Sequence, residues 1–194
     1  MTSPSRLWNH PVNAPTPVNG PITAMPYDEA RLRQFKQERS RILHAIGERA
    51  LAIEHLGSTS IPGLAAKPII DIMLVVANCA DENAYVPELE AAGFVLRIRE
   101  PIESDDTPFN GEEPHRVFKG PEIDVNLHVW SLGSPEIDRH VSFRDWLRAH
   151  PEDLALYERT KLELAARTWA SVQQYADAKT DVIEELRARA SRGR

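Results

Sequence analysis

The spacing of apolar residues predicts that the chain alternates helices and strands. Between residues 27 and 46 the apolar positions recur near a helical period, with charged residues on the other face, which predicts an amphipathic helix. The apolar runs at residues 51–56 and 69–76 have the length of strands. The second run is apolar on both faces, which is typical of a central strand that is covered on both sides.

The middle of the chain continues this alternation. Residues 82–92 have the spacing of a helix that ends at Gly93, because glycine favours the conformation that closes a helix. A strand is predicted over residues 94–98. Residues 101–114 contain three prolines and two acidic clusters without any period, so we expect a mobile loop there.

Two further strands are predicted at residues 116–119 and 123–130. They are expected to pair with each other, because Gly120 and Pro121 form a turn signal between them. One face of the second strand is apolar, and the other carries Asp124, Asn126, His128 and Trp130. This polar stripe is a candidate for chemistry, although the solvated face of an antiparallel strand has the same pattern.

The C-terminal third of the sequence is helical. Helix starts are predicted at Ser134, at Pro151 and at Ser171, where Gln174 has the spacing of a capping box for a helix that runs to about residue 190. Together the elements predict an α+β fold, in which a mixed sheet is covered by helices and followed by a C-terminal helical segment.

The beginning of the chain differs in kind from the rest. Residues 1–21 contain five prolines and few apolar groups, so they cannot hold a helix or offset their ordering entropy. We expect a flexible arm here, with docking on a partner subunit through Leu7 and Trp8 as the alternative. A single domain is expected over residues 22–192.

Composition and charge narrow the function classes. The formal charge of -6 argues against sequence-independent binding to nucleic acid. Apolar runs are far shorter than the roughly 20 residues of a membrane helix, so no membrane partner is expected. The single cysteine, Cys79, cannot form an internal disulfide and is expected to be buried in a reducing compartment, which favours the cytoplasm. The oligomeric state is left open.

An aspartate inside an apolar strand is the feature most informative about function. An ionised Asp71 in the run 69–76 costs several kcal/mol of desolvation unless a metal, a cation or hydrogen bonds compensate it. A glycine-containing loop precedes this strand. It is not a P-loop, because Gly57 and Gly63 are one residue too far apart and Leu64 stands where that motif requires lysine.

The distance from the Gly57-Ser58 pair to Asp71 is similar to that in the nucleotidyltransferase superfamily, and the sequence resembles the GrpB family, whose fold is nucleotidyltransferase-like. The resemblance covers about residues 22–190. The family commonly has a histidine at the position of Asn126, which argues against a two-histidine site. The matching segments are residues 55–71, 127–129 and 143–151, and the pairs Tyr157 with Lys161 and Tyr175 with Lys179.

The resemblance implies that loop amides and hydroxyls hold phosphate groups and neutralise a transferred phosphoryl group. It implies catalytic roles for Asp71 and for His128, the latter as a ligand or as a general acid or base. The expected phosphate-binding residues are Gly57, Ser58, Thr59, Ser60, Lys67 and Arg116.

The expected cofactor is Mg²⁺ or Mn²⁺, but a two-metal centre of the usual kind is unavailable. Met73 stands where the second carboxylate would project, and a thioether does not bind Mg²⁺. A site made of Asp71, Asp124 and His128 is geometrically conceivable. The simpler alternatives are that Asp71 caps the loop amides without a metal and that Lys67 neutralises it structurally.

We therefore expect a protein that binds a phosphorylated small molecule, with a nucleotide favoured, and that transfers a nucleotidyl group to a small acceptor. The alternative is a non-catalytic nucleotide-sensing or interaction module, because similar domains occur fused to dephospho-CoA kinase and Met73 removes a metal ligand. Whether the chain is an enzyme is left open by the sequence.

Overall fold

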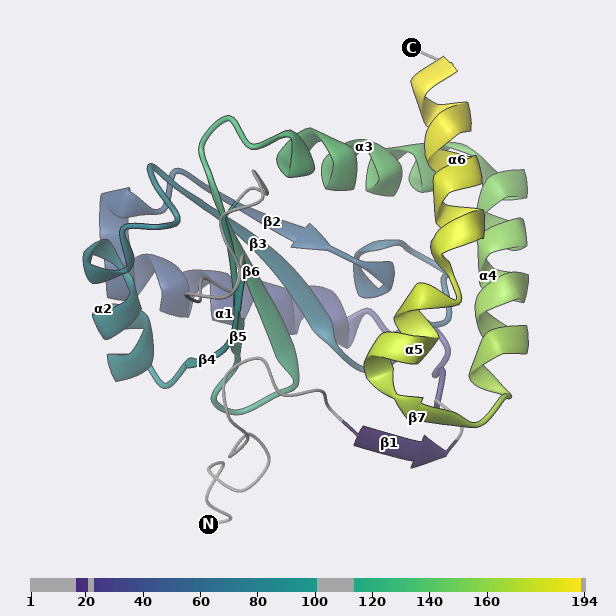
Figure 1. Cartoon of the computed structure of the whole chain (residues 1–194), viewed down its shortest axis with the longest axis horizontal. Helices are drawn as coiled ribbons and strands as arrows, with labels where there is room; N and C mark the ends of the chain where they lie inside the picture. The colour runs from purple at the N-terminus through teal and green to yellow at the C-terminus, as the bar shows by residue number, and fades with distance from the viewer. Residues whose placement is uncertain (1–16, 21–22, 101–113, 193–194) are drawn as a thin grey trace, which may run out of the picture.

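The structure is built around a five-stranded mixed sheet (Figure 1). The computed structural model describes residues 17–20, 23–100 and 114–192. The strand order is β2-β3-β6-β5-β4, in which β3 and β6 are parallel and all other neighbours are antiparallel. The strands are β2 (Ala52–Leu56), β3 (Ile70–Val76), β4 (Val95–Glu100), β5 (His115–Lys119) and β6 (Val125–Ser131).

Helices cover both faces of this sheet. On one face lie α1 (Ala30–Ile46) and α2 (Val86–Ala91), and α3 (Pro135–Ala149) crosses the other (Figure 1). Three short 3-10 turns complete this part of the described chain: η2 (Gly47–Arg49), η3 (Ser58–Ser60) and η4 (Glu82–Ala84). The predicted α+β fold, a mixed sheet covered by helices, is confirmed.

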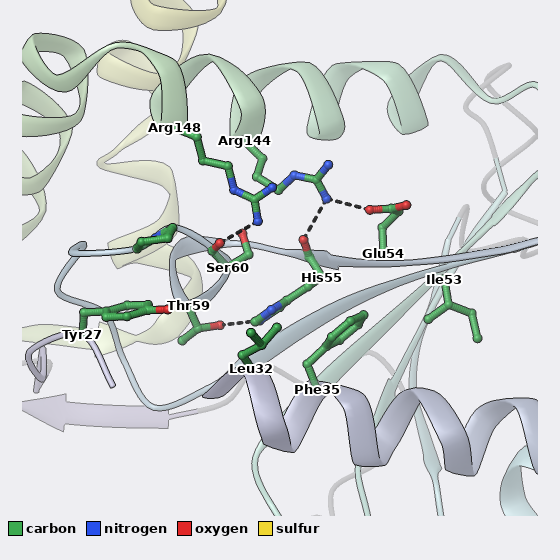
Figure 2. A pocket seen from close by; sticks show the side chains of 11 residues that line it. Tyr27, Leu32, Phe35, Ile53, Glu54, His55, Thr59, Ser60, Arg144 and Arg148 are labelled. Carbon is green, nitrogen blue, oxygen red and sulfur yellow. Dashed lines mark hydrogen bonds and ion pairs between the residues drawn. The ribbon is translucent and has the colours of Figure 1, made fainter. Parts of the chain in front are cut away.

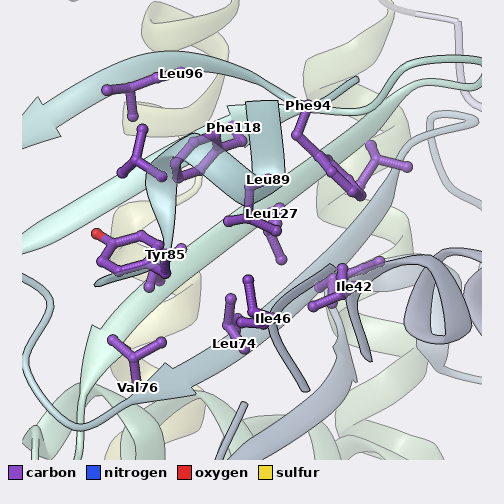
Figure 3. Packing of buried hydrophobic residues seen from close by; sticks show 14 of the residues in the cluster. Ile42, Ile46, Leu74, Val76, Tyr85, Leu89, Phe94, Leu96, Phe118 and Leu127 are labelled. Atoms are coloured by element: carbon purple, nitrogen blue, oxygen red, sulfur yellow. The ribbon is translucent and has the colours of Figure 1, made fainter. Parts of the chain in front are cut away.

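The main hydrophobic core fills the space between the sheet and the first pair of helices. Aliphatic side chains from α1, β3 and β6 pack there against aromatic ones such as Tyr85 and Phe118 (Figure 3). Leu74 of β3 is fully buried in this core. Because successive strand residues point to opposite faces, Asp71 and Met73 are directed to the α3 side.

The C-terminal helices pack together beside the loop that follows β2. Helices α4 (Pro151–Ala165) and α6 (Thr180–Arg192) bury Tyr157 and Leu186 against Ile61 and Leu64. The Ser134 and Ser171 caps form as predicted, because each side chain accepts a backbone N–H of the first helical turn. The helix predicted from residue 171 is divided into α5 (Val172–Asp177) and α6 by a turn at residues 178–179.

Two segments differ from the expectation. The helix predicted over residues 82–92 begins as η4 and becomes α-helical only at Val86, because Pro87 lacks an N–H and suits the first turn of a helix. Residues Pro17–Gly20 of the expected flexible arm form β1, which pairs antiparallel with β7 (Trp169–Ser171). The expected loop at 101–113 and residues 1–16 lie outside the described residues.

None of the helices in residues 23–100 and 114–192 combines the length and the apolar character needed to cross a bilayer.

Leu74 provides a test of the core. Replacing Leu74, which is 0% exposed, by alanine removes buried contacts and leaves a cavity, and we expect a loss of about 2–5 kcal/mol in the free energy of unfolding. The matched control is Leu132→Ala at a 67% exposed position, where we expect a change within about 0.5 kcal/mol. Urea unfolding measures both, and equal effects would contradict the assigned core.

Candidate functional site

The strand β2 ends in a tight turn that lies directly on Asp71. Gly57 has φ 65°, and the antiparallel register pairs Leu56 with Asp71 at the start of β3. A Cβ atom on Gly57 would lie 2.1 Å from Asp71 Oδ2. Glycine is therefore needed at position 57 for two reasons: its backbone conformation, and the lack of space for a side chain beside Asp71.

Asp71 is held by the neighbouring strand β6. Asn126 Nδ2 donates to Asp71 Oδ1 at 2.7 Å, and His128 Nε2 lies 3.8 Å from the same oxygen. Burial acts to raise the pKa of Asp71, but His128, Asn126 and the charge of Lys67 outweigh it and hold that pKa below its usual value. Asp71 is therefore ionised at neutral pH, and its side chain remains 27% exposed.

A buried lysine contacts the loop from the other side. Lys161 of α4 is 5% exposed, and its Nζ donates to Ser58 Oγ at 2.7 Å and to the Ala65 carbonyl at 2.8 Å. Burial, with the positive charge of Lys179 adding to it, lowers the pKa of Lys161 to about 7. Ser58 is thereby fixed by a side chain 103 positions away in the sequence.

Two more lysines complete a group that we call the lysine cluster, Lys67, Lys161 and Lys179. Lys67 and Lys179 lie 5.4 and 4.6 Å from the ring centroid of Tyr175. Burial lowers the pKa of Lys67, and burial together with the positive charge of Lys67 lowers the pKa of Lys179 to about 8. Within the described chain, no member of the cluster has a carboxylate oxygen within 4.0 Å.

A row of stacked rings extends from Asp71 across the same face of the sheet. His128 Nδ1 lies 3.1 Å from His115 Nε2, and His115 Nδ1 lies 3.1 Å from Glu100 Oε2. The two imidazoles are nearly parallel, and the Trp130 ring stacks on both. Hydrogen bonds thus connect Glu100, on β4, with the histidine beside Asp71.

The structure brings five of the expected site residues together: Gly57, Ser58, Lys67, Asp71 and His128. The hydroxyls of the next two loop residues are already used. Thr59 donates to the Ile69 carbonyl, and Ser60 donates to the Gly57 carbonyl. These two side chains hold the loop in shape rather than facing Asp71.

Arg116 and Asp124 are not placed as expected. Arg116 lies opposite Val129 in the β5–β6 register and faces the α2 side, where its Nε binds Glu82 at 2.6 Å. It is therefore separated from Asp71 by the sheet. Asp124 is engaged by Lys119, whose Nζ lies 3.0 Å from Oδ1.

The expected metal set of Asp71, Asp124 and His128 is not assembled. Across residues 23–100 and 114–192, no three His, Cys, Asp or Glu side chains are grouped so that they could hold a metal ion. Asp71 faces the lysine cluster, and the positive charges of that cluster disfavour a cation beside it. A protein-held Mg²⁺ or Mn²⁺ therefore does not fit these residues.

A separate cavity of about 300 Å³ lies on the other side of the loop, between α1, β2 and α3 (Figure 2). Thr59 and Ser60 line it, together with the guanidinium of Arg148, which donates to the Ser60 carbonyl at 2.7 Å. His55 stacks on Phe35 with ring centroids 4.7 Å apart. Burial lowers the pKa of His55 to about 4, so this ring is neutral.

Sequence reasoning underrated Lys161 and Lys179 and missed the contribution of His115. A signal was present for the lysines, since Tyr157 and Lys161, and likewise Tyr175 and Lys179, are four residues apart and lie on one helical face. No local pattern identifies His115, because its role depends on the pairing of β5 with β6.

Comparison with known proteins identifies relatives of this chain in sequence and in fold. The sequence profile of the family described as GrpB protein matches residues 21–189. A UPF0157 protein of Halalkalibacterium halodurans is 51% identical over 175 residues, which cover 90% of this chain and 85% of that protein. The crystal structure of the conserved protein GrpB from Enterococcus faecalis superposes with a TM-score of 0.71 at 27% identity, covering 87% of this chain and 96% of that one.

A dephospho-CoA kinase of Mycolicibacterium paratuberculosis is also similar. It is 27% identical over 209 residues, which cover 95% of this chain and 51% of the kinase. The chain thus spans about half the length of that relative.

Gly57 and Gly63 form a matched pair for testing the contact with Asp71. Both have positive φ, which strains alanine at either position, and Gly57 with ψ −173° lies in a backbone region essentially restricted to glycine. Gly63 has open space around its Cβ position, whereas at Gly57 the new atom meets Asp71. We expect Gly57→Ala to cost about 1–3 kcal/mol more than Gly63→Ala in urea unfolding. Equal losses would show that the close approach is absent.

Proposed function

Because the chain belongs to the GrpB family, we propose that it binds a phosphorylated small molecule, a nucleotide in the first instance, with phosphate groups at Ser58 and the lysine cluster beside Asp71. The chemistry of the donors supports this ligand class. Ammonium groups and a serine hydroxyl are donors suited to phosphate oxygens.

The observation that carries the proposal is a group of buried lysines without a direct ion pair in the described chain. Lys67, Lys161 and Lys179 have lowered pKa values, and their ammonium groups lie over tyrosine rings rather than within 4.0 Å of a carboxylate oxygen. Holding like charges together in partly buried positions is unfavourable. A phosphate dianion would remove this cost, and that relief would appear as binding free energy.

The finer part of the proposal is group transfer. An acceptor hydroxyl would attack the α-phosphorus of a nucleoside triphosphate, forming one P–O bond while the bond to the leaving pyrophosphate breaks. The hydroxyl proton would pass to a base at the site, for which His128 is placed beside Asp71. The lysine cluster would neutralise charge on the phosphates, and a divalent ion would enter only on the phosphates of the ligand.

A second candidate function is nucleotide sensing without turnover. Met73 occupies the place of a second metal-binding carboxylate on the Asp71 face of β3, which favours this alternative. The similarity to half of a dephospho-CoA kinase is consistent with an accessory domain that binds the same class of ligand.

Lys161→Met tests the binding site directly. The substitution keeps an unbranched side chain and removes the charged ammonium group, so we expect the affinity for ATP, GTP, CTP or UTP, whichever binds, to fall about tenfold or more in calorimetric titration. The matched control is Lys36→Met on the exposed surface of α1, which should leave the affinity unchanged. No binding of any triphosphate by the wild type, with or without Mg²⁺ or Mn²⁺, would refute the proposal.

The lowered lysine pKa values predict proton uptake on binding. At pH 8 Lys161 is largely neutral in the free protein, and a bound phosphate raises its pKa and recharges it. Affinity should therefore fall as pH rises from about 7 to 9, and titrations at pH 8 in buffers of different ionisation enthalpy should show net uptake. Since the phosphate itself is fully ionised there, with its second pKa near 6, it does not mask the effect. Proton release or no exchange would contradict the lysine assignment.

Turnover separates the two candidate functions. We expect release of pyrophosphate from the bound triphosphate in the presence of a panel of hydroxyl and amine acceptors, and loss of that release in Asp71→Asn. Triphosphate binding that survives in Asp71→Asn, without pyrophosphate release by the wild type, would favour the sensing module.

A further inference from the structure

We infer that His128 Nε2 and Asp71 Oδ1 form a subsite for the hydroxyl or amine donor of a second substrate, and that Glu100 and His115 are positioning residues that place the proton of the neutral His128 ring on Nδ1. The identity of the reaction rests on the proposed function. The proton arrangement itself does not, because it follows from the hydrogen bonds of the ligand-free protein.

Glu100 fixes the direction of both hydrogen bonds in the chain from Glu100 through His115 to His128. The hydrogen bond from His115, opposed by burial, lowers the pKa of Glu100, so this carboxylate is ionised and can only accept. His115 Nδ1 must then carry the proton that lies between the two side chains at 3.1 Å. Glu100 thereby determines the protonated nitrogen of the first imidazole.

The position of the proton on His128 follows from the position of the proton on His115. Burial lowers the pKa of His115, so the ring is neutral and its Nε2 has a lone pair. A lone pair can only accept, and therefore the 3.1 Å contact requires the proton on His128 Nδ1. When the His128 ring is neutral, Nε2 is therefore the nitrogen without a proton, and it is the nitrogen nearest to Asp71.

Packing holds the two rings in this orientation. The imidazoles of His115 and His128 are 2° from parallel, and Trp130 stacks on both with interplanar angles of 7° and 8°. On its far side Trp130 contacts His140 of α3, with ring centroids 5.1 Å apart. A rotation of either imidazole by a half turn about χ2 would break a hydrogen bond without relieving a clash.

In this neutral state of His128, two acceptors face each other without a donor between them. His128 Nε2 and Asp71 Oδ1 are 3.8 Å apart, which is too far for a hydrogen bond. Both side chains are partly exposed, at 25% and 27%, so a ligand group can reach them. An O–H or N–H placed here could donate to either atom, and this chemistry selects a hydroxyl or amine rather than another anion.

In this subsite His128 Nε2 would serve as the general base for the proposed nucleotidyl transfer. The O–H bond of the acceptor breaks, its proton passes to the lone pair of His128 Nε2, and the acceptor oxygen forms a bond to phosphorus as pyrophosphate leaves. Protonated His128 would then be stabilised by ionised Asp71 on one side and by the chain of hydrogen bonds to Glu100 on the other.

The tautomer of His128 can be measured on the ligand-free protein by ¹⁵N NMR of the imidazole nitrogens through their two-bond couplings. We expect the proton on Nδ1 in both His115 and His128, whereas exposed His44 serves as an internal reference for an unrestrained ring. A proton on Nε2 of His128 would overturn the inference. This readout requires neither a ligand nor turnover. The inferred tautomer can therefore be wrong while the proposed function is right, and the proposed function can be wrong while the tautomer is right.

Variants test whether Glu100 and His115 act as positioning residues. Glu100→Leu removes the acceptor, and we expect both histidines to shift toward the Nε2-protonated form. Glu100→Gln, whose amide oxygen can still accept from His115 Nδ1, should restore the wild-type tautomers. Glu90→Leu, at an exposed position, is the matched control and should change neither ring.

His115→Phe keeps a ring for stacking and removes the acceptor for His128. We expect His128 to lose its Nδ1 preference, and any pyrophosphate release to fall by roughly 100-fold in kcat with the KM for the triphosphate unchanged. Circular dichroism and thermal unfolding confirm that each variant is folded. Unchanged His128 tautomers in both His115→Phe and Glu100→Leu would refute the positioning role.

Discussion

The contact between the backbone of Gly57 and the carboxylate of Asp71 is the constraint on which the site depends. It exists because β2 and β3 are antiparallel in a register that places the end of one strand beside the start of the other. A carboxylate in this position cannot move without moving the loop. The same contact therefore sets the position of Ser58 and, through it, the position of the lysine on α4.

Charge in the site is organised by the two faces of one sheet. Arg116 and Glu82 form an ion pair on the face of the sheet that α2 covers. On the α3 face the described lysines of the cluster form no ion pair within 4.0 Å, and the histidine row carries protons rather than fixed charge. The sheet therefore separates the Arg116–Glu82 ion pair on one face from the lysine cluster, which has no such pair in the described chain, on the other.

Much of the fold could be predicted from local pattern, and much of the site could not. The strands β2, β3 and β6 and the capped starts of α3 and α5 follow from period and from single residues such as Ser134 and Ser171. Arg116 was expected at the site because it lies next to the polar strand in sequence, but alternation along β5 directs it to the opposite face. The lysine cluster depends on packing between α4, the turn after α5 and the loop, which no local period encodes.

The internal bonds of the β2–β3 loop have a consequence for recognition. The hydroxyls of Thr59 and Ser60 donate to backbone carbonyls at the two ends of the loop, and His55 forms a further hydrogen bond with Thr59. A loop that is already held by internal hydrogen bonds would lose little conformational entropy if a ligand bound to it. The conformation of this loop is therefore set during folding, before any binding event.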